Sequence, residues 1–134
     1  MRQNLIGHVL AGAALIAGVV LGPANARAEP TSTFAFFDEL GSTSGGVIWF
    51  NRSVQTQGEV CDSLEPGFQW VRFMYWLTPG GVGSPWDVQT RTVSNGCRSF
   101  NFVVEGPRGG IQRVDVAICN SGMECHPIDS LTRP

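Results

Sequence analysis

The chain contains no lysine: all nine of its basic residues are arginines, set against eleven acidic residues and two histidines. Without lysine, Schiff-base and lysine-nucleophile chemistry are excluded. Charged residues are only 15% of the chain, and the arginines form no run or patch. We therefore expect no binding to nucleic acid, which requires clustered basic side chains to contact phosphates. Helical periodicity is also missing beyond residue 28, which favours an all-β protein.

A long apolar run occurs only at the start of the chain, where residues 1–28 have the pattern of a secretory signal peptide. Arg2 gives a positive start, and residues 9–22 are an apolar run of 14 residues. Residues 26–28 (ARA) supply the small side chains that signal peptidase recognises, so we expect cleavage before Glu29, with cleavage after Ala26 as the second choice. A membrane anchor is the alternative, but a spanning helix needs about 20 apolar residues.

Residues 29–134 then form a single secreted domain, which we expect to be extracellular and free of membrane in its mature form. This part keeps seven arginines and all eleven acidic residues, so its net charge is −4. A chain of this length can build a core but gains from covalent support.

All four cysteines lie in this exported part, and an even number there indicates two disulfides. Four cysteines allow three pairings. We favour Cys119–Cys125, which closes a tight loop over the turn sequence at 120–122, and Cys61–Cys97 then follows by elimination. Metal binding is the alternative, but the spacings are not those of paired zinc ligands, so we expect neither a metal nor a cofactor.

Seven segments alternate like strands and are separated by glycine- and proline-rich breakers. They predict an antiparallel β-sandwich of about seven strands, immunoglobulin-like or jelly-roll in style, with a small β-barrel as the alternative. Residues 41–46 (GSTSGG) are interpreted as a flexible connection and residues 123–134 as a polar tail. The predicted strands cover residues 31–37, 47–51, 54–60, 69–77, 86–93, 97–105 and 111–119.

The segment at 69–77 (QWVRFMYWL) carries the most aromatic surface and is predicted to be the central strand. With a period of two residues, its odd-numbered positions form an apolar core face. The opposite face should be polar in an open sheet, yet it is aromatic. We therefore take this face as the candidate binding site, formed by Trp70, Arg72, Met74 and Trp76.

A row of indoles with an arginine suits stacking against a sugar or contact with another protein. The alternative is that residues 34–37 or the loop at 78–85 fold over this face, because exposed apolar patches of this size are rare on monomers. The exposure of Trp70 and Trp76 distinguishes the two cases.

Catalytic groups are sparse in the exported part. Its single histidine, His126, has no partner that the sequence identifies, and no nucleophile elbow surrounds a serine. No motif fixes the acidic residues as a pair, so we interpret them as solvated surface groups and predict no catalytic residue.

These observations favour a secreted, non-catalytic β-sandwich that acts as a binding or structural surface module, with carbohydrate or another protein as its partner. Two alternatives remain from other classes. A protease inhibitor would present the loop at 78–85, or the loop after Cys61, as a rigid protrusion flanked by a disulfide. A small extracellular hydrolase would gather acidic residues and histidine in one cleft.

Overall fold

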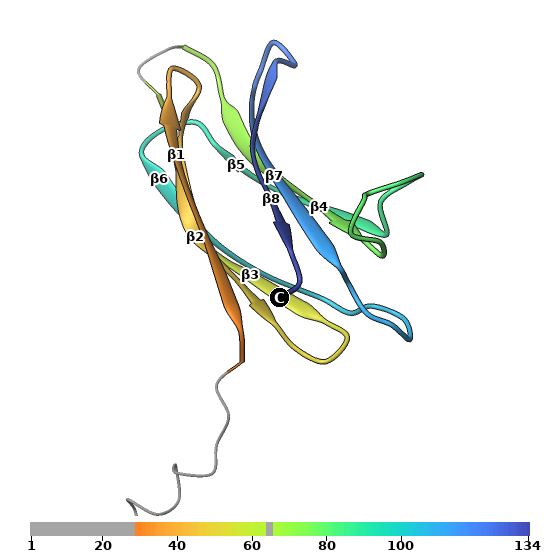
Figure 1. Cartoon of the computed structure of the whole chain (residues 1–134). Coiled ribbons are helices and arrows are strands. Elements are labelled where there is room, and N and C mark those ends of the chain that lie inside the picture. Colours follow the sequence, from red (N-terminus) through yellow and green to blue (C-terminus); the bar gives the residue numbers. More distant parts are fainter. Residues whose placement is uncertain (1–28, 64–65) are drawn as a thin grey trace, which may run out of the picture.

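The computed structural model of the chain describes residues 29–63 and 66–134, so the predicted signal peptide at 1–28 lies outside the described residues. The described part is all-β, with eight strands in two antiparallel sheets that pack face to face (Figure 1). It contains no helix that could cross a membrane. In chain order the strands are β1 (Thr31–Asp38), β2 (Gly41–Trp49), β3 (Val54–Cys61), β4 (Gln69–Trp76), β5 (Asp87–Val93), β6 (Cys97–Val104), β7 (Arg113–Asn120) and β8 (Cys125–Thr132).

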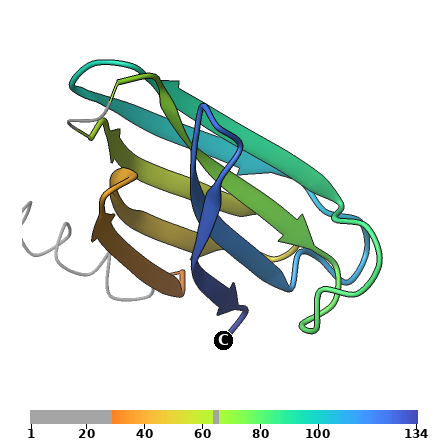
Figure 2. The ribbon, with the colours of Figure 1, turned by 90° about the horizontal axis from the view of Figure 1, so that it is seen from above.

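One sheet has the strand order β1-β2-β3-β6 and the other the order β5-β4-β7-β8. The two layers are seen from above in Figure 2. Because β3 pairs with β6 and β4 with β7, the chain passes between the sheets three times. This interlocking of strands distant in sequence is typical of immunoglobulin-like sandwiches. The predicted β-sandwich is therefore confirmed, and the two separate sheets argue against the barrel alternative.

Two predictions about local structure were wrong. Residues 41–46 are not a flexible connection but the first part of β2, and the tail forms β8, which gives eight strands instead of seven. The glycines at 41–46 suggested a loop, yet Gly45 lies directly opposite Gly58 on β3. A side chain on Gly45 would collide with the backbone of Gln57 and Gly58. Glycine is needed there for close approach of the strands, not for a turn.

The space beside these glycines is filled by aromatic rings from both sheets. Phe34 and Phe100 lie in register on either side of the glycine pair. Phe73, from β4 in the opposite sheet, packs 5.8 Å from the Phe34 ring centroid and 5.0 Å from that of Phe100. Nearby, the hydroxyls of Tyr75 and Thr56 share a buried hydrogen bond of 2.9 Å between the sheets.

Arg133 closes one end of the sandwich. Its Nη1 donates to the Phe50 carbonyl at 2.6 Å and its Nε to the Ile111 carbonyl at 2.8 Å. The guanidinium also lies 5.2 Å from the ring centroid of the buried Trp49, within range of a cation–π interaction. The last residues of the chain therefore hold segments of both sheets together.

The two predicted disulfides, Cys61–Cys97 and Cys119–Cys125, are confirmed. Each joins residues that lie directly opposite in neighbouring strands, β3 with β6 and β7 with β8. Each therefore lies within one sheet, unlike the disulfide that links the two sheets of antibody domains. Two disulfides indicate an oxidising, extracellular type of environment.

Candidate functional site

The candidate face lies on the outer side of β4, between β5 and β7 in the middle of its sheet. The alternation is as predicted: Val71, Phe73 and Tyr75 point inward and are fully buried. On the outer side, the structure distinguishes two ends. Trp70, Arg72 and Met74 are half-buried, whereas Trp76 is only 8% exposed.

Trp76 is covered by the loop between β4 and β5. A Cβ atom on Gly81 of that loop would lie 3.4 Å from the Trp76 ring. The indole Nε1 donates to Asp115 Oδ2 at 3.0 Å, and Arg113 Nη1 donates to the Pro79 carbonyl at 3.2 Å, which holds the loop down. At this end of the face, the alternative in which the loop at 78–85 covers the aromatic side chain is therefore correct. The expected row of two indoles, Trp70 and Trp76, is reduced to Trp70 alone.

Trp70 lies at the other end of the face, away from the covering loop. Its ring packs 5.8 Å from that of Phe68, which is exposed just before β4. Because Trp70 is in register with Cys119, the Cys119–Cys125 disulfide flanks it on the outer face. The indole is thus supported on two sides and half-buried, as a rigid stacking surface requires.

Two positions along β4 from Trp70, beginning at Arg72, the outer face is hollowed across β4, β7 and β8, with a cavity volume of about 270 Å³; Trp70 itself does not line this hollow. Ala117 lies directly opposite Arg72, and its small side chain leaves room that a larger residue would fill. The walls combine apolar groups with both signs of charge. The lining residues are Arg72, Met74, Arg113, Asp115, Val116, Ala117, Pro127, Asp129 and Ser130.

The two arginines of this hollow differ in whether their hydrogen-bond donors have partners. Arg113 donates to both carboxylate oxygens of Asp115, at 2.6 and 3.2 Å, and to Ser130 Oγ at 3.1 Å. Arg72, in contrast, has a buried Nε with no hydrogen-bond partner in the described part of the chain. Buried donors are almost always paired, so this one suggests a group that a ligand would satisfy.

The sequence identified no partner for His126, but the structure gives it two. Its Nδ1 lies 2.6 Å from Asp38 Oδ2 and its Nε2 lies 3.0 Å from Glu124 Oε1. Hydrogen bonds to these carboxylates raise the pKa of His126 above its usual value. Since both ring nitrogens are occupied, neither is available as a general base. The ring instead ties β8 to the end of β1 in the opposite sheet.

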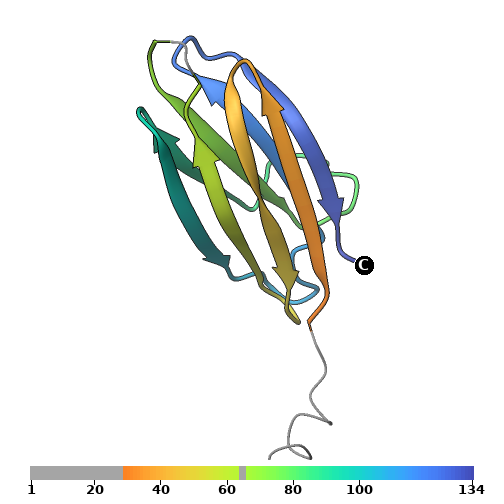
Figure 3. The ribbon, with the colours of Figure 1, turned by 90° about the vertical axis from the view of Figure 1, so that its left-hand side faces the viewer.

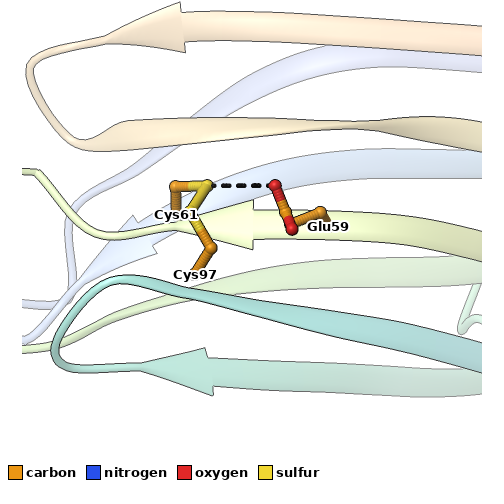
Figure 4. Close-up of side chains that lie close together, drawn as sticks. All are labelled: Glu59, Cys61 and Cys97. Carbon is orange, nitrogen blue, oxygen red and sulfur yellow. Dashed lines mark hydrogen bonds between the residues drawn. A yellow bond between two sulfur atoms is a disulfide. The ribbon is translucent and has the colours of Figure 1, made fainter.

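A second cluster, Glu59 with Cys61 and Cys97, gathers three groups of metal-binding type on the other sheet (Figure 4). Its two sulfurs form a disulfide, so neither is a thiolate that could bind a metal. A disulfide sulfur also has no proton to donate, so the 3.5 Å approach of Glu59 Oε1 to Cys61 Sγ is a contact only. The cluster is therefore a structural disulfide with a carboxylate beside it.

The loop at 78–85 extends from the sandwich (Figure 1), and Val82 is 80% exposed. Both disulfides lie at the opposite end of the sandwich, because they join the end of β3 to the start of β6 and the end of β7 to the start of β8. The disulfide-flanked loop that would favour an inhibitor is therefore not formed by 78–85. The loop after Cys61 includes residues 64–65, outside the described part.

Sequence reasoning identified Trp70 and Arg72 but missed the residues of β7 and β8 that complete the hollow. The two-residue alternation of β7 alone places Asp115 and Ala117 on its outer face, so this signal was present in the sequence. Pro127, Asp129 and Ser130 had no such signal, because the tail was not recognised as a strand.

Searches against protein-family models, curated proteins and solved structures found no match to this chain. The candidate site therefore rests on the geometry alone.

Proposed function

We propose that this protein is a secreted, non-catalytic binding module that binds carbohydrate on its outer face at Trp70 and Arg72. The observation that carries the proposal is the hollow itself: a half-buried indole stands beside it, and a buried arginine donor in it lacks a partner. Secretion is supported by the signal-peptide pattern and by the two disulfides.

The chemistry of a sugar matches both parts of this surface. The apolar face of a pyranose packs against an aromatic ring, and its hydroxyls need charged or polar groups at the rim. Trp70 and Arg72 are two positions apart on one strand, so they lie about 7 Å from each other. Asp129 and Ser130 add an acceptor and a hydroxyl on the far wall. The volume lies near the lower limit of about 300 Å³ for ligand sites, which suits one sugar unit.

Arg72 further favours an acidic sugar. A carboxylate would pair with its guanidinium in a charge-assisted hydrogen bond, which is about twice as strong as a neutral one. Asp115 already accepts from Arg113 and Trp76, so it has less capacity to repel or bind the ligand. We therefore expect oligosaccharides that contain uronic acid to bind more tightly than neutral ones.

Isothermal titration calorimetry with oligogalacturonate, cello-oligosaccharides and chito-oligosaccharides tests the proposal. Trp70→Ala should weaken the binding by at least about tenfold, as for a tryptophan at a binding hot spot. Trp86→Ala is the matched control, because Trp86 is 48% exposed and bonds to the Glu105 carbonyl, away from the hollow. Binding by none of the three sugars, or equal loss in both variants, would contradict the proposal.

A further inference from the structure

The two sheets leave four edge strands, β1, β5, β6 and β8. An exposed edge presents unpaired backbone groups, and proteins protect such edges with charges, prolines or bulges. Three of the four carry such features. They are Asp87 and Arg91 on β5, Arg98 on β6, and Pro127, Asp129 and an irregular register on β8.

Strand β1 carries none of these protections along most of its length. Residues 31–37 (TSTFAFF) contain no charge and no proline, and all eight residues of β1 pair with β2 without a register shift. Figure 3 shows β1 in orange at the edge of the nearer sheet. On its outer face Phe37 is 85% exposed, a large apolar group in water. This edge has the properties of an interaction strand.

The hydrogen bonds between β1 and β2 also show which backbone groups of β1 are free. The amide of Trp49 donates to the Pro30 carbonyl at 2.9 Å, so Pro30 is a hydrogen-bonded position. In an antiparallel pair such positions recur at every second residue. The even-numbered residues of β1 therefore bond to β2. The amides and carbonyls that point away from the sheet belong to Thr31, Thr33, Ala35 and Phe37.

We propose that a second copy of this chain pairs with this edge, β1 against β1, around a twofold axis at Ala35. The free amide and carbonyl of Ala35 would bond to those of Ala35 in the second copy, and Phe37 would face Thr33 of that copy. The two four-stranded sheets would join into one continuous sheet. Asp38, the one charged residue of β1, would face Ser32 of the second copy, so this self-pairing sets no like charges opposite each other.

Two properties favour this register over its neighbours: the absence of like-charge pairs and the number of β1 residues that are paired. An axis at Phe34 would set Glu39 opposite Glu29 of the second copy, a repulsive pair. An axis at Phe36 would pair fewer residues of β1. The axis at Ala35 sets Glu39 opposite Thr31 and keeps most of the strand paired. The carbohydrate hollow lies on the other sheet, so this inference is independent of the proposed function.

Sedimentation velocity over a wide range of protein concentrations tests the association. The native protein should dimerise reversibly, and Ala35→Lys should weaken the dimer by at least about tenfold, since it sets two like charges opposite each other. Ser44→Lys is the matched control: Ser44 lies directly opposite Ala35 on β2 and shares its outer face, but it is not at the edge. A monomer at every concentration, or equal weakening by both variants, would overturn the proposal.

Cross-linking tests the register. After oxidation, Ala35→Cys should form a disulfide-linked dimer, because directly opposite residues lie within disulfide reach. Thr33→Cys should remain largely unlinked, because it would face Phe37 of the second copy. Efficient cross-linking of Thr33→Cys but not of Ala35→Cys would overturn the proposed register. Melting temperatures near that of the native protein would show that the variants are folded.

Discussion

Replacing Trp76 with alanine tests whether the loop between β4 and β5 is part of the folded structure or only a flexible cover. The Trp76 side chain is 8% exposed, its Nε1 donates to Asp115, and Gly81 packs against its ring. Truncation therefore removes a buried aromatic, one charge-assisted hydrogen bond and the surface on which the loop rests.

The expected loss of unfolding free energy is about 3 kcal/mol, the lower end of the range for buried aromatics. The lower end applies because the site is on the outer face, where the loop can partly collapse and water can enter. Trp76→Phe separates the two contributions. It keeps most of the buried area and removes the indole donor, and Asp115 remains bonded to Arg113, so the expected loss is about 1 kcal/mol.

Urea denaturation of the oxidised proteins, followed by circular dichroism, measures both losses. The transition slope should not change, since the whole domain unfolds in each variant. A loss within about 0.5 kcal/mol for Trp76→Ala would refute the reasoning, because only exposed side chains give so small an effect. Such a result would mean that the Trp76 side chain is exposed in solution and is available as a second stacking residue.

Three further predictions concern contacts between the sheets. Asp38 and Glu124 raise the pKa of His126, so its stabilising effect should be full below the unfolded pKa of about 6.5 and should disappear as the pH rises through the folded value. The melting-temperature difference between the native protein and His126→Ala should follow this course. Tyr75→Phe leaves Thr56 unpaired and should cost about 1 to 3 kcal/mol in urea. Arg133→Ala should cost about 2 kcal/mol or more in the same assay, since it exposes two carbonyls and uncovers Trp49.

The sequence was sufficient for the sandwich and for most strands, because alternation is a local signal. It was sufficient for both disulfides because the short Cys119–Cys125 loop left only Cys61 and Cys97 to pair. The failures have physical causes that are not local. Gly45 is in a strand because Gly58 faces it across the sheet, and the pairing of His126 with Asp38 joins positions 88 residues apart. No pattern within either segment contains that information.

The candidate site likewise contains features that a local pattern predicts and features that it does not. Trp70, Arg72, Met74 and Trp76 were assigned to one face correctly, since the strand period alone decides this. Which of them a loop covers depends on the path of residues 77–86, whose glycines fit many conformations. The hollow depends on β8, whose proline and irregular register concealed the strand pattern.

The most direct test of the central claim is a titration of the isotope-labelled protein with oligogalacturonate, observed through the indole signals of its four tryptophans in ¹H–¹⁵N correlation spectra. The account predicts a saturable shift of the Trp70 signal, while the signal of Trp49, which is buried in the core and bonds to Ser32 on the sheet that does not carry the hollow, remains unchanged. A Trp70 signal that does not move at saturating sugar, or shifts centred on Trp86, would contradict it.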